Sequence, residues 1–197
     1  ELGRRHYVMP LRKYISENPP EGWPNTWPQG LMQLQTDDKG DIYGFPNHDG
    51  PIMLYYRKDL FEDPANQLAF KAKYGYDLKP AETWDEFLDI CKFFTKDGMY
   101  GTVLASKQGG QQLPYDFMMM LYSFGGKMFD ENWKPRFNSQ AGIDGLQYYV
   151  DLRNKYKVSP KTSTIYDELE NGDFYLKGHA ATLWHWSHIA SWAEMPE

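Results

Sequence analysis

From residue 51 towards the C-terminus, short apolar segments alternate with helices whose ends are marked in the sequence. The segments 51–56, 100–105 and 180–184 have the length and apolar content of buried strands. The stretches between them carry apolar residues on one helical face and are bounded by capping residues and glycines. A chain with this alternation covers a sheet with helices, so we expect an α/β layered fold.

Capping residues and glycines set the expected helix ends. Thr83 and Glu86 have the spacing of a capping box, and Gly98 ends the helix that follows. Further helices are expected over 114–124, stopped by Gly125 and Gly126, and over about 166–177. Another helix follows the Asn138-Ser139 cap and runs to Pro160. Its expected apolar face comprises Ile143, Leu146, Tyr149 and Val150.

The N-terminal part has a different character. Prolines and glycines interrupt residues 10–40, which predicts short helical turns and loops. A short strand is expected over 41–46, and 47–50 has the composition of a turn leading into the strand at 51–56. No internal repeat or low-complexity tract interrupts the chain.

The charge excludes one large class of partners. The chain has a net charge of -6, a pI near 5.4 and no polybasic run, so it does not have the basic face of a nucleic-acid-binding protein. No stretch reaches the ~20 apolar residues that cross a bilayer. The chain begins at Glu1 without the apolar core of a signal peptide, so we expect a processed or excised segment. Cys91 is the one cysteine and is expected in the core.

The motifs of common enzyme classes are missing. The sequence has no nucleophile elbow, no zinc-protease helix, no phosphate-binding glycine loop and no calcium loop. A glycoside hydrolase with two catalytic carboxylates stays an alternative, although no particular pair stands out among the 27 acidic residues. His185 and His188 have helical spacing for one metal, but no third ligand clusters with them. We therefore expect no enzyme activity, no metal and no cofactor.

Trp184-His185-Trp186 is the densest chemical feature of the chain. It closes a predicted strand just before a helix, where open α/β sheets place their ligand crevices. On a continuing strand, Trp184 and Trp186 share one face and His185 takes the other. Aromatic rings stack on the apolar faces of ring-shaped ligands, but they also build ordinary cores. Both interpretations stay open at this point.

Several motifs, taken in order, resemble one known family, the sugar-binding proteins of ATP-driven importers to which maltose-binding protein belongs. The motifs are Leu54-Tyr55-Tyr56-Arg57-Lys58-Asp59-Leu60-Phe61, Glu82-Thr83-Trp84-Asp85-Glu86-Phe87, Phe124-Gly125-Gly126 and Phe174-Tyr175-Leu176-Lys177-Gly178-His179-Ala180-Ala181. Each is weak alone, and their order and spacing together are specific. The resemblance covers nearly the whole chain, but the family's members are much longer.

The resemblance implies a two-lobed periplasmic-binding-protein-like fold of which this chain holds a part. Residues 1–48 correspond to part of the first lobe, 49–54 to the hinge crossing and 55–197 to most of the second lobe. Such a protein binds a mono- or oligosaccharide or a polyol between its lobes, without a cofactor, and delivers it to membrane permease subunits. The expected protein is monomeric, periplasmic or extracellular in a bacterial-type cell, and in some cases lipid-anchored. A non-sugar solute in the same scaffold is the alternative.

The resemblance also implies ligand-binding positions. Tyr115 corresponds to the pocket-wall tyrosine that precedes the paired glycines, of which Gly126 is included as a ligand-binding position. The hinge turn and the strand end supply the rest. These residues are His48, Asp49, Gly50, Trp184, His185 and Trp186. The chain departs from maltose-binding protein at the strand end, where that protein has an Asn-Gly-Pro run before its tryptophan, so the specific sugar is not implied.

Overall fold

The computed structural model describes residues 7–46 and 50–194, which divide into two compact units, Glu1–Pro51 and Ile52–Glu197. The first unit contains α1 (Arg12–Glu17) and α2 (Gln29–Leu34) among turns. The prediction of a strand over 41–46 is wrong, because the segment forms only an isolated antiparallel bridge between Ile42 and Thr36. The carboxylate of Asp37 accepts the backbone N–H groups of Lys39 and Asp41, so this segment closes a tight turn instead of extending a ladder.

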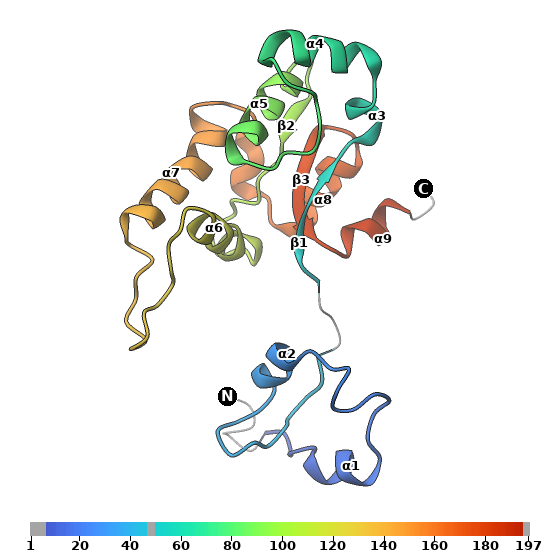
Figure 1. Ribbon diagram of the computed structural model, residues 1–197, viewed down its shortest axis with the longest axis vertical. Helices are drawn as coiled ribbons and strands as arrows, with labels where there is room; N and C mark the ends of the chain where they lie inside the picture. Colours follow the sequence, from blue (N-terminus) through green and yellow to red (C-terminus); the bar gives the residue numbers. More distant parts are fainter. Residues whose placement is uncertain (1–6, 47–49, 195–197) are drawn as a thin grey trace. The chain divides into compact units, whose positions relative to one another are not determined.

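The second unit is built on a mixed three-stranded sheet (Figure 1). β1 (Ile52–Tyr56) pairs antiparallel with the central strand β3 (Ala180–Trp186), and β2 (Tyr100–Thr102) pairs parallel with β3 on its other side. The register sets Ile52 opposite Trp186 and Tyr56 opposite Thr182. The expected strands at 51–56, 100–105 and 180–184 are therefore confirmed in position, with ends shifted by a few residues.

Helices connect and cover these strands. They are α3 (Lys58–Phe61), α4 (Pro64–Tyr74), α5 (Trp84–Phe94), α6 (Gln112–Ser123), α7 (Gln140–Asn154), the 3₁₀ turn η1 (Lys161–Ile165), α8 (Glu168–Leu176) and α9 (Ile189–Ala193). Figure 1 shows α5, α6 and α7 on one side of β3, and α8 and α9 on the other. Within residues 7–46 and 50–194, no helix is long and apolar enough to cross a membrane. The α/β layered expectation is confirmed.

The two faces of β3 belong to different core clusters. Trp184 packs with side chains of α5, α6 and α7, including Cys91, whose free thiol is buried in the core as expected. Leu183, one position earlier, packs with side chains of α8 and α9 on the opposite face. This follows from the period of two along a strand, and it puts two layers of helices around one short central strand.

The helix caps largely follow the sequence. Ser139 caps α7 by accepting the N–H of Gly142, and Thr83 caps α5 by accepting the N–H of Glu86 at 3.2 Å. The return bond of the expected capping box differs, because the Glu86 carboxylate accepts the N–H of Glu82 in place of that of Thr83. The helix also ends at Phe94, earlier than the expected stop at Gly98.

The apolar face expected for α7 is wrong in part. Ile143 and Leu146 are 53% and 45% exposed, while Gly145 and Leu152 are buried with Tyr149. The reason is close helix packing, since a Cβ on Gly145 would lie only 3.0 Å from the carbonyl oxygen of Met120 in α6. α7 therefore turns a glycine-containing stripe towards α6, because glycine lets two backbones approach.

Candidate ligand-binding site

An apolar groove of about 510 Å³ opens on the second unit between β1, α5 and α6. Its walls come from the start of β1, the N-terminal end of α5 and the C-terminal half of α6. The residues that line it are Ile52, Met53, Leu54, Ala81, Glu82, Thr83, Trp84, Phe87, Met119, Ser123 and Trp184. Glu82 is the one charged side chain in this set. The groove thus offers apolar surface with a carboxylate and two hydroxyls at its rim.

Tyr115 and Trp186 meet beyond the end of this groove. Their ring centroids lie 4.8 Å apart with the planes at 81°, an edge-to-face contact. Tyr115 lies one helical turn before the groove residue Met119 on α6, and Trp186 pairs across the sheet with Ile52, another groove residue. Tyr115 is 43% exposed and Trp186 is half-buried, so the pair is open to solvent. We call it the Tyr115–Trp186 pair.

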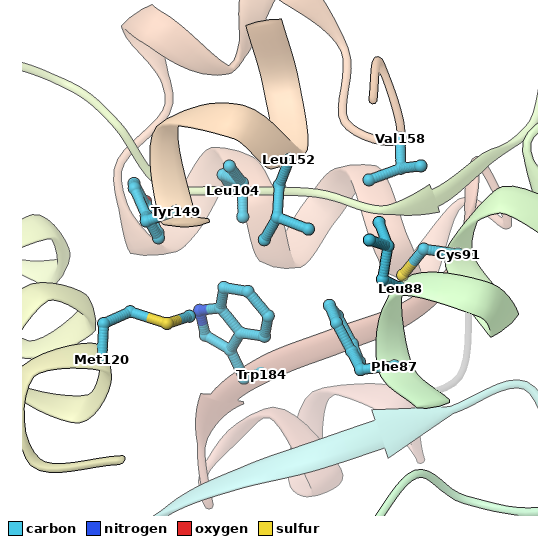
Figure 2. Close-up of a cluster of buried hydrophobic side chains, with 9 residues drawn as sticks. All are labelled: Phe87, Leu88, Cys91, Leu104, Met120, Tyr149, Leu152, Val158 and Trp184. Atoms are coloured by element: carbon cyan, nitrogen blue, oxygen red, sulfur yellow. The ribbon is translucent and has the colours of Figure 1, made fainter. Parts of the chain in front are cut away.

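Trp184 lies on the same face of β3 but in the interior. It is 2% exposed and packs against Phe87 and Trp84 of α5, with ring centroids at 5.1 and 5.7 Å. Figure 2 shows its indole between Met120 of α6 and Phe87, below Leu152 of α7. Trp184 therefore forms the floor of the groove and a part of the core at once.

A buried polar cluster lies next to Trp184. The Asp116 carboxylate accepts Gln112 Nε2 at 2.7 Å and Tyr149 Oη at 3.0 Å. Burial raises the pKa of Asp116 to about 7, although hydrogen bonds from Gln112 and Tyr149 act in the opposite direction. The carboxyl has no exposed surface, so no ligand in the groove reaches it without rearrangement.

His185 is oriented by structural contacts. It is fully buried on the opposite face of β3, with Nε2 at 2.9 Å from the carbonyl oxygen of Glu168 and Nδ1 at 3.3 Å from that of Trp186. Its ring packs on His188 and Trp192 of the following segment. In the part of the chain that the structure describes, no three His, Cys, Asp or Glu side chains gather to hold a metal.

The glycines and the hinge turn complete the expected set. Gly125 has a left-handed φ of 82°, and Gly126 donates its N–H to the carbonyl oxygen of Leu121 at 2.8 Å, so the pair ends α6 as predicted. A Cβ on Gly126 would lie 2.3 Å from Leu121 Cδ1 and 3.0 Å from the carbonyl oxygen of Leu121, so the close approach to α6 also favours glycine here. Gly50 is described and half-buried in the first unit. His48 and Asp49 lie outside the described residues.

The structure thus brings Tyr115 and Trp186 together and separates both from His185. The direct role of each predicted residue in ligand binding stays a prediction. The sequence analysis missed the groove residues Trp84 and Met119. Trp84 had a usable signal, because it follows the helix cap Thr83 at an element end, where side chains of α/β layers are left uncovered.

Comparison with known proteins agrees with this architecture. The family model of bacterial extracellular solute-binding proteins matches residues 1–193. An arabinooligosaccharide-binding protein of Halalkalibacterium halodurans is 24% identical over 153 residues, covering 74% of this chain and 31% of that protein. A mannitol-binding protein of Pseudomonas aeruginosa is 26% identical over 132 residues, covering 66% of this chain and 28% of that protein.

A solved structure gives the same result in three dimensions. The maltose-bound MalE3 of T. maritima superimposes with a TM-score of 0.79 at 29% identity, covering 96% of this chain and 44% of that one. The chain spans less than half the length of each of these three relatives. It has the periplasmic-binding-protein-like fold, of which it covers a part, and it belongs to the family of bacterial extracellular solute-binding proteins.

Proposed function

We propose that this chain binds a carbohydrate, either a mono- or oligosaccharide or a polyol, as the substrate-binding component of an ATP-driven importer. The observation that carries the proposal is the Tyr115–Trp186 pair, which is open to solvent at the end of an apolar groove. A contiguous exposed apolar surface beside a groove is a common mark of a ligand- or partner-binding site.

The chemistry of the groove fits a sugar. A sugar ring presents apolar C–H faces and hydroxyl groups, so its site combines aromatic planes with a few acceptors and donors. Tyr115 and Trp186 supply the planes beyond one end of the groove. Glu82, Thr83 and Ser123 supply polar groups at the rim of the groove. The relatives named for an arabinooligosaccharide and for mannitol, together with the maltose-bound structure, favour this ligand class.

A charged solute fits the groove less well. A phosphate ester requires Lys or Arg that is free to bind it, but the residues that line the groove include neither, and the neighbouring Lys79 is paired with Glu82. The carboxylate of Glu82 is held by Lys79, whose hydrogen bond and charge keep the pKa of Glu82 below its usual range. An amine ligand would have to compete with that lysine. A neutral hydroxylated ligand needs no such exchange.

Catalysis is also disfavoured by the carboxyl groups near the site. A glycoside hydrolase needs an acid with a raised pKa that can reach the glycosidic oxygen. Asp116 has a raised pKa but is buried, whereas Glu82 is accessible but has a lowered pKa. We therefore infer that the protein binds its ligand without turnover. We further propose that it works as a monomer outside the cytoplasmic membrane and presents its ligand to permease subunits.

Isothermal titration calorimetry of the chain with maltose, D-mannitol and an arabino-oligosaccharide tests the ligand class, with glucose 6-phosphate as the charged comparison. Trp186→Ala and Tyr115→Ala should each weaken binding of the preferred sugar. Trp133→Ala is the matched control, because Trp133 is 79% exposed and its ring contacts Phe129, away from the groove and from the Tyr115–Trp186 pair. Equal losses in all three variants, or preference for the phosphate ester, would contradict the proposal.

A further inference from the structure

Asp116 occupies the helix position directly after Tyr115 and points the opposite way. Tyr115 reaches out to Trp186, whereas Asp116 is fully buried between α6, α7 and β3. Its two oxygens accept Gln112 Nε2 and Tyr149 Oη. The Nε1 of Trp184 is buried in the same region with no hydrogen-bond partner of good geometry. The Asp116 carboxyl on α6 thus contacts α7 and lies beside β3, and α6 and β3 carry Tyr115 and Trp186.

The hydrogen bonds around Tyr149 depend on the proton of Asp116. Tyr149 Oη lies 3.0 Å from Asp116 Oδ2, 3.1 Å from the carbonyl oxygen of Ala105 and 3.3 Å from Ser106 Oγ. The Ser106 hydroxyl can donate to Tyr149, but Tyr149 has a single hydrogen to donate to the other two. When Asp116 is ionised, that hydrogen is drawn to the carboxylate and the Ala105 carbonyl loses it. When Asp116 is protonated, the acid donates to Tyr149 and Tyr149 donates to Ala105, so both contacts are made.

The groups around Asp116 place its change of protonation near neutral pH. Burial raises the pKa of Asp116 to about 7, while Gln112, the Trp184 indole and Tyr149 lower the pKa and the charge of Asp167 raises it. Burial also raises the pKa of Tyr149 well above its usual value, with the charge of Asp116 as the next cause, so the phenol stays protonated. The charge of Arg153, on α7, lowers the pKa of Tyr149, but by less than burial raises it.

We propose that Asp116 is a positioning residue that links its own protonation to the placement of the Tyr115–Trp186 pair. The carboxyl lies on the α6 backbone next to Tyr115, and it faces Trp184, two positions before Trp186 on β3. The protonated form satisfies the Tyr149 and Ala105 contacts together, so α6, α7 and the segment after β2 are joined in one network. The ionised form releases the Ala105 contact and shifts the support of the pair. The effect on carbohydrate binding rests on the proposed function, but the linkage itself does not.

The linkage can be measured without a ligand. Nuclear magnetic resonance of the chain, with labelled aspartate carboxyls and tryptophan indoles, follows Asp116 and the Trp186 Nε1–H from pH 5 to 9. Asp116→Asn and Trp186→Phe assign the two signals. We expect both signals in the unmodified chain to titrate with a shared midpoint of about 7. In Asp116→Asn the Trp186 signal should no longer show that midpoint, although every histidine is retained.

Tyr149→Phe provides a second variant in case the asparagine variant folds poorly. It removes a donor to the ionised carboxyl, so the shared midpoint should move to higher pH. A midpoint for Asp116 near that of an exposed aspartate would overturn the proposal. So would a Trp186 signal that keeps the same pH dependence in Asp116→Asn.

Calorimetry with maltose and D-mannitol at pH 5.5 and 8.5 tests the consequence for binding. Affinity for the sugar that binds should be higher at pH 5.5 by about tenfold in the unmodified chain, the equivalent of one pKa unit of linkage. In Asp116→Asn the affinity should be almost independent of pH. Coupled titration without binding of either sugar would refute the proposed ligand class and leave the positioning role standing. Binding with unchanged pH dependence in Asp116→Asn would refute the positioning role alone.

Discussion

Replacing Trp184 and Trp186 separately by alanine should have opposite consequences, although both rings lie on one face of β3. Trp184 is 2% exposed and contacts α5, α6 and α7, so Trp184→Ala leaves a cavity in the main core. A buried tryptophan replaced by alanine costs about 3–5 kcal/mol of unfolding free energy. Trp186 is half-buried, so Trp186→Ala loses part of its apolar burial together with the edge-to-face contact with Tyr115, and we expect a smaller cost of roughly 1–3 kcal/mol.

Binding should respond in the reverse order. An aromatic anchor in direct contact with a ligand contributes roughly 2 kcal/mol or more when truncated, which is about a thirtyfold loss of affinity. We expect this loss for Trp186→Ala in the fraction that is folded. Trp184→Ala should affect affinity mainly through the folded fraction, because its ring supports the groove from beneath.

Urea unfolding followed by circular dichroism gives the free energies, and calorimetry under folding conditions gives the affinities. Trp133→Ala is the control for loss of an exposed tryptophan, and it should change neither by more than about 0.5 kcal/mol. The reasoning would be refuted by a Trp184→Ala protein of nearly unchanged stability. A Trp186→Ala protein that unfolds readily but, when folded, binds sugar with full affinity would refute it equally.

Further predictions concern the core. The pKa of Asp116 is about 7 in the folded state and 3.8 in an unfolded chain, so the folded state binds more protons between these pH values. The free energy of unfolding should therefore fall as pH rises from 4 to 7, by at most ~4 kcal/mol. Urea unfolding of Asp116→Asn across this range should give a flatter curve. Gly101→Ala should destabilise by about 1–3 kcal/mol or prevent folding, because its Cβ would lie 2.2 Å from the backbone of Cys91; a thermal melt like that of the unmodified chain would contradict this. Leu152→Ala should lower the free energy of unfolding by about 2–5 kcal/mol and Leu146→Ala by less than about 1 kcal/mol, because only Leu152 is buried. Equal losses of the two variants in chemical denaturation would contradict the assigned buried face of α7.

Local signals in the sequence determined most of the secondary structure. Ser139 and Thr83 cap their helices with hydrogen bonds that span three residues, so a short window of sequence contains both partners. The glycines that end helices and the apolar strands are equally local signals. The face alternation of Trp184, His185 and Trp186 also follows from the strand alone, because the period of two needs no tertiary information.

Tertiary structure decided which of these surfaces is buried. On α7, the buried face contains glycines that let α6 approach closely, whereas Ile143 and Leu146 face solvent. The sequence of α7 alone does not predict this, because it depends on the position of α6. Trp184 and Trp186 share a face, but α5 and α7 cover one ring and leave the other beside Tyr115. The Asp116 cluster joins residues 33 and 68 positions apart, whose contact no local pattern encodes. Burial and long-range hydrogen bonds depend on which segments meet, so they became visible only in the folded chain.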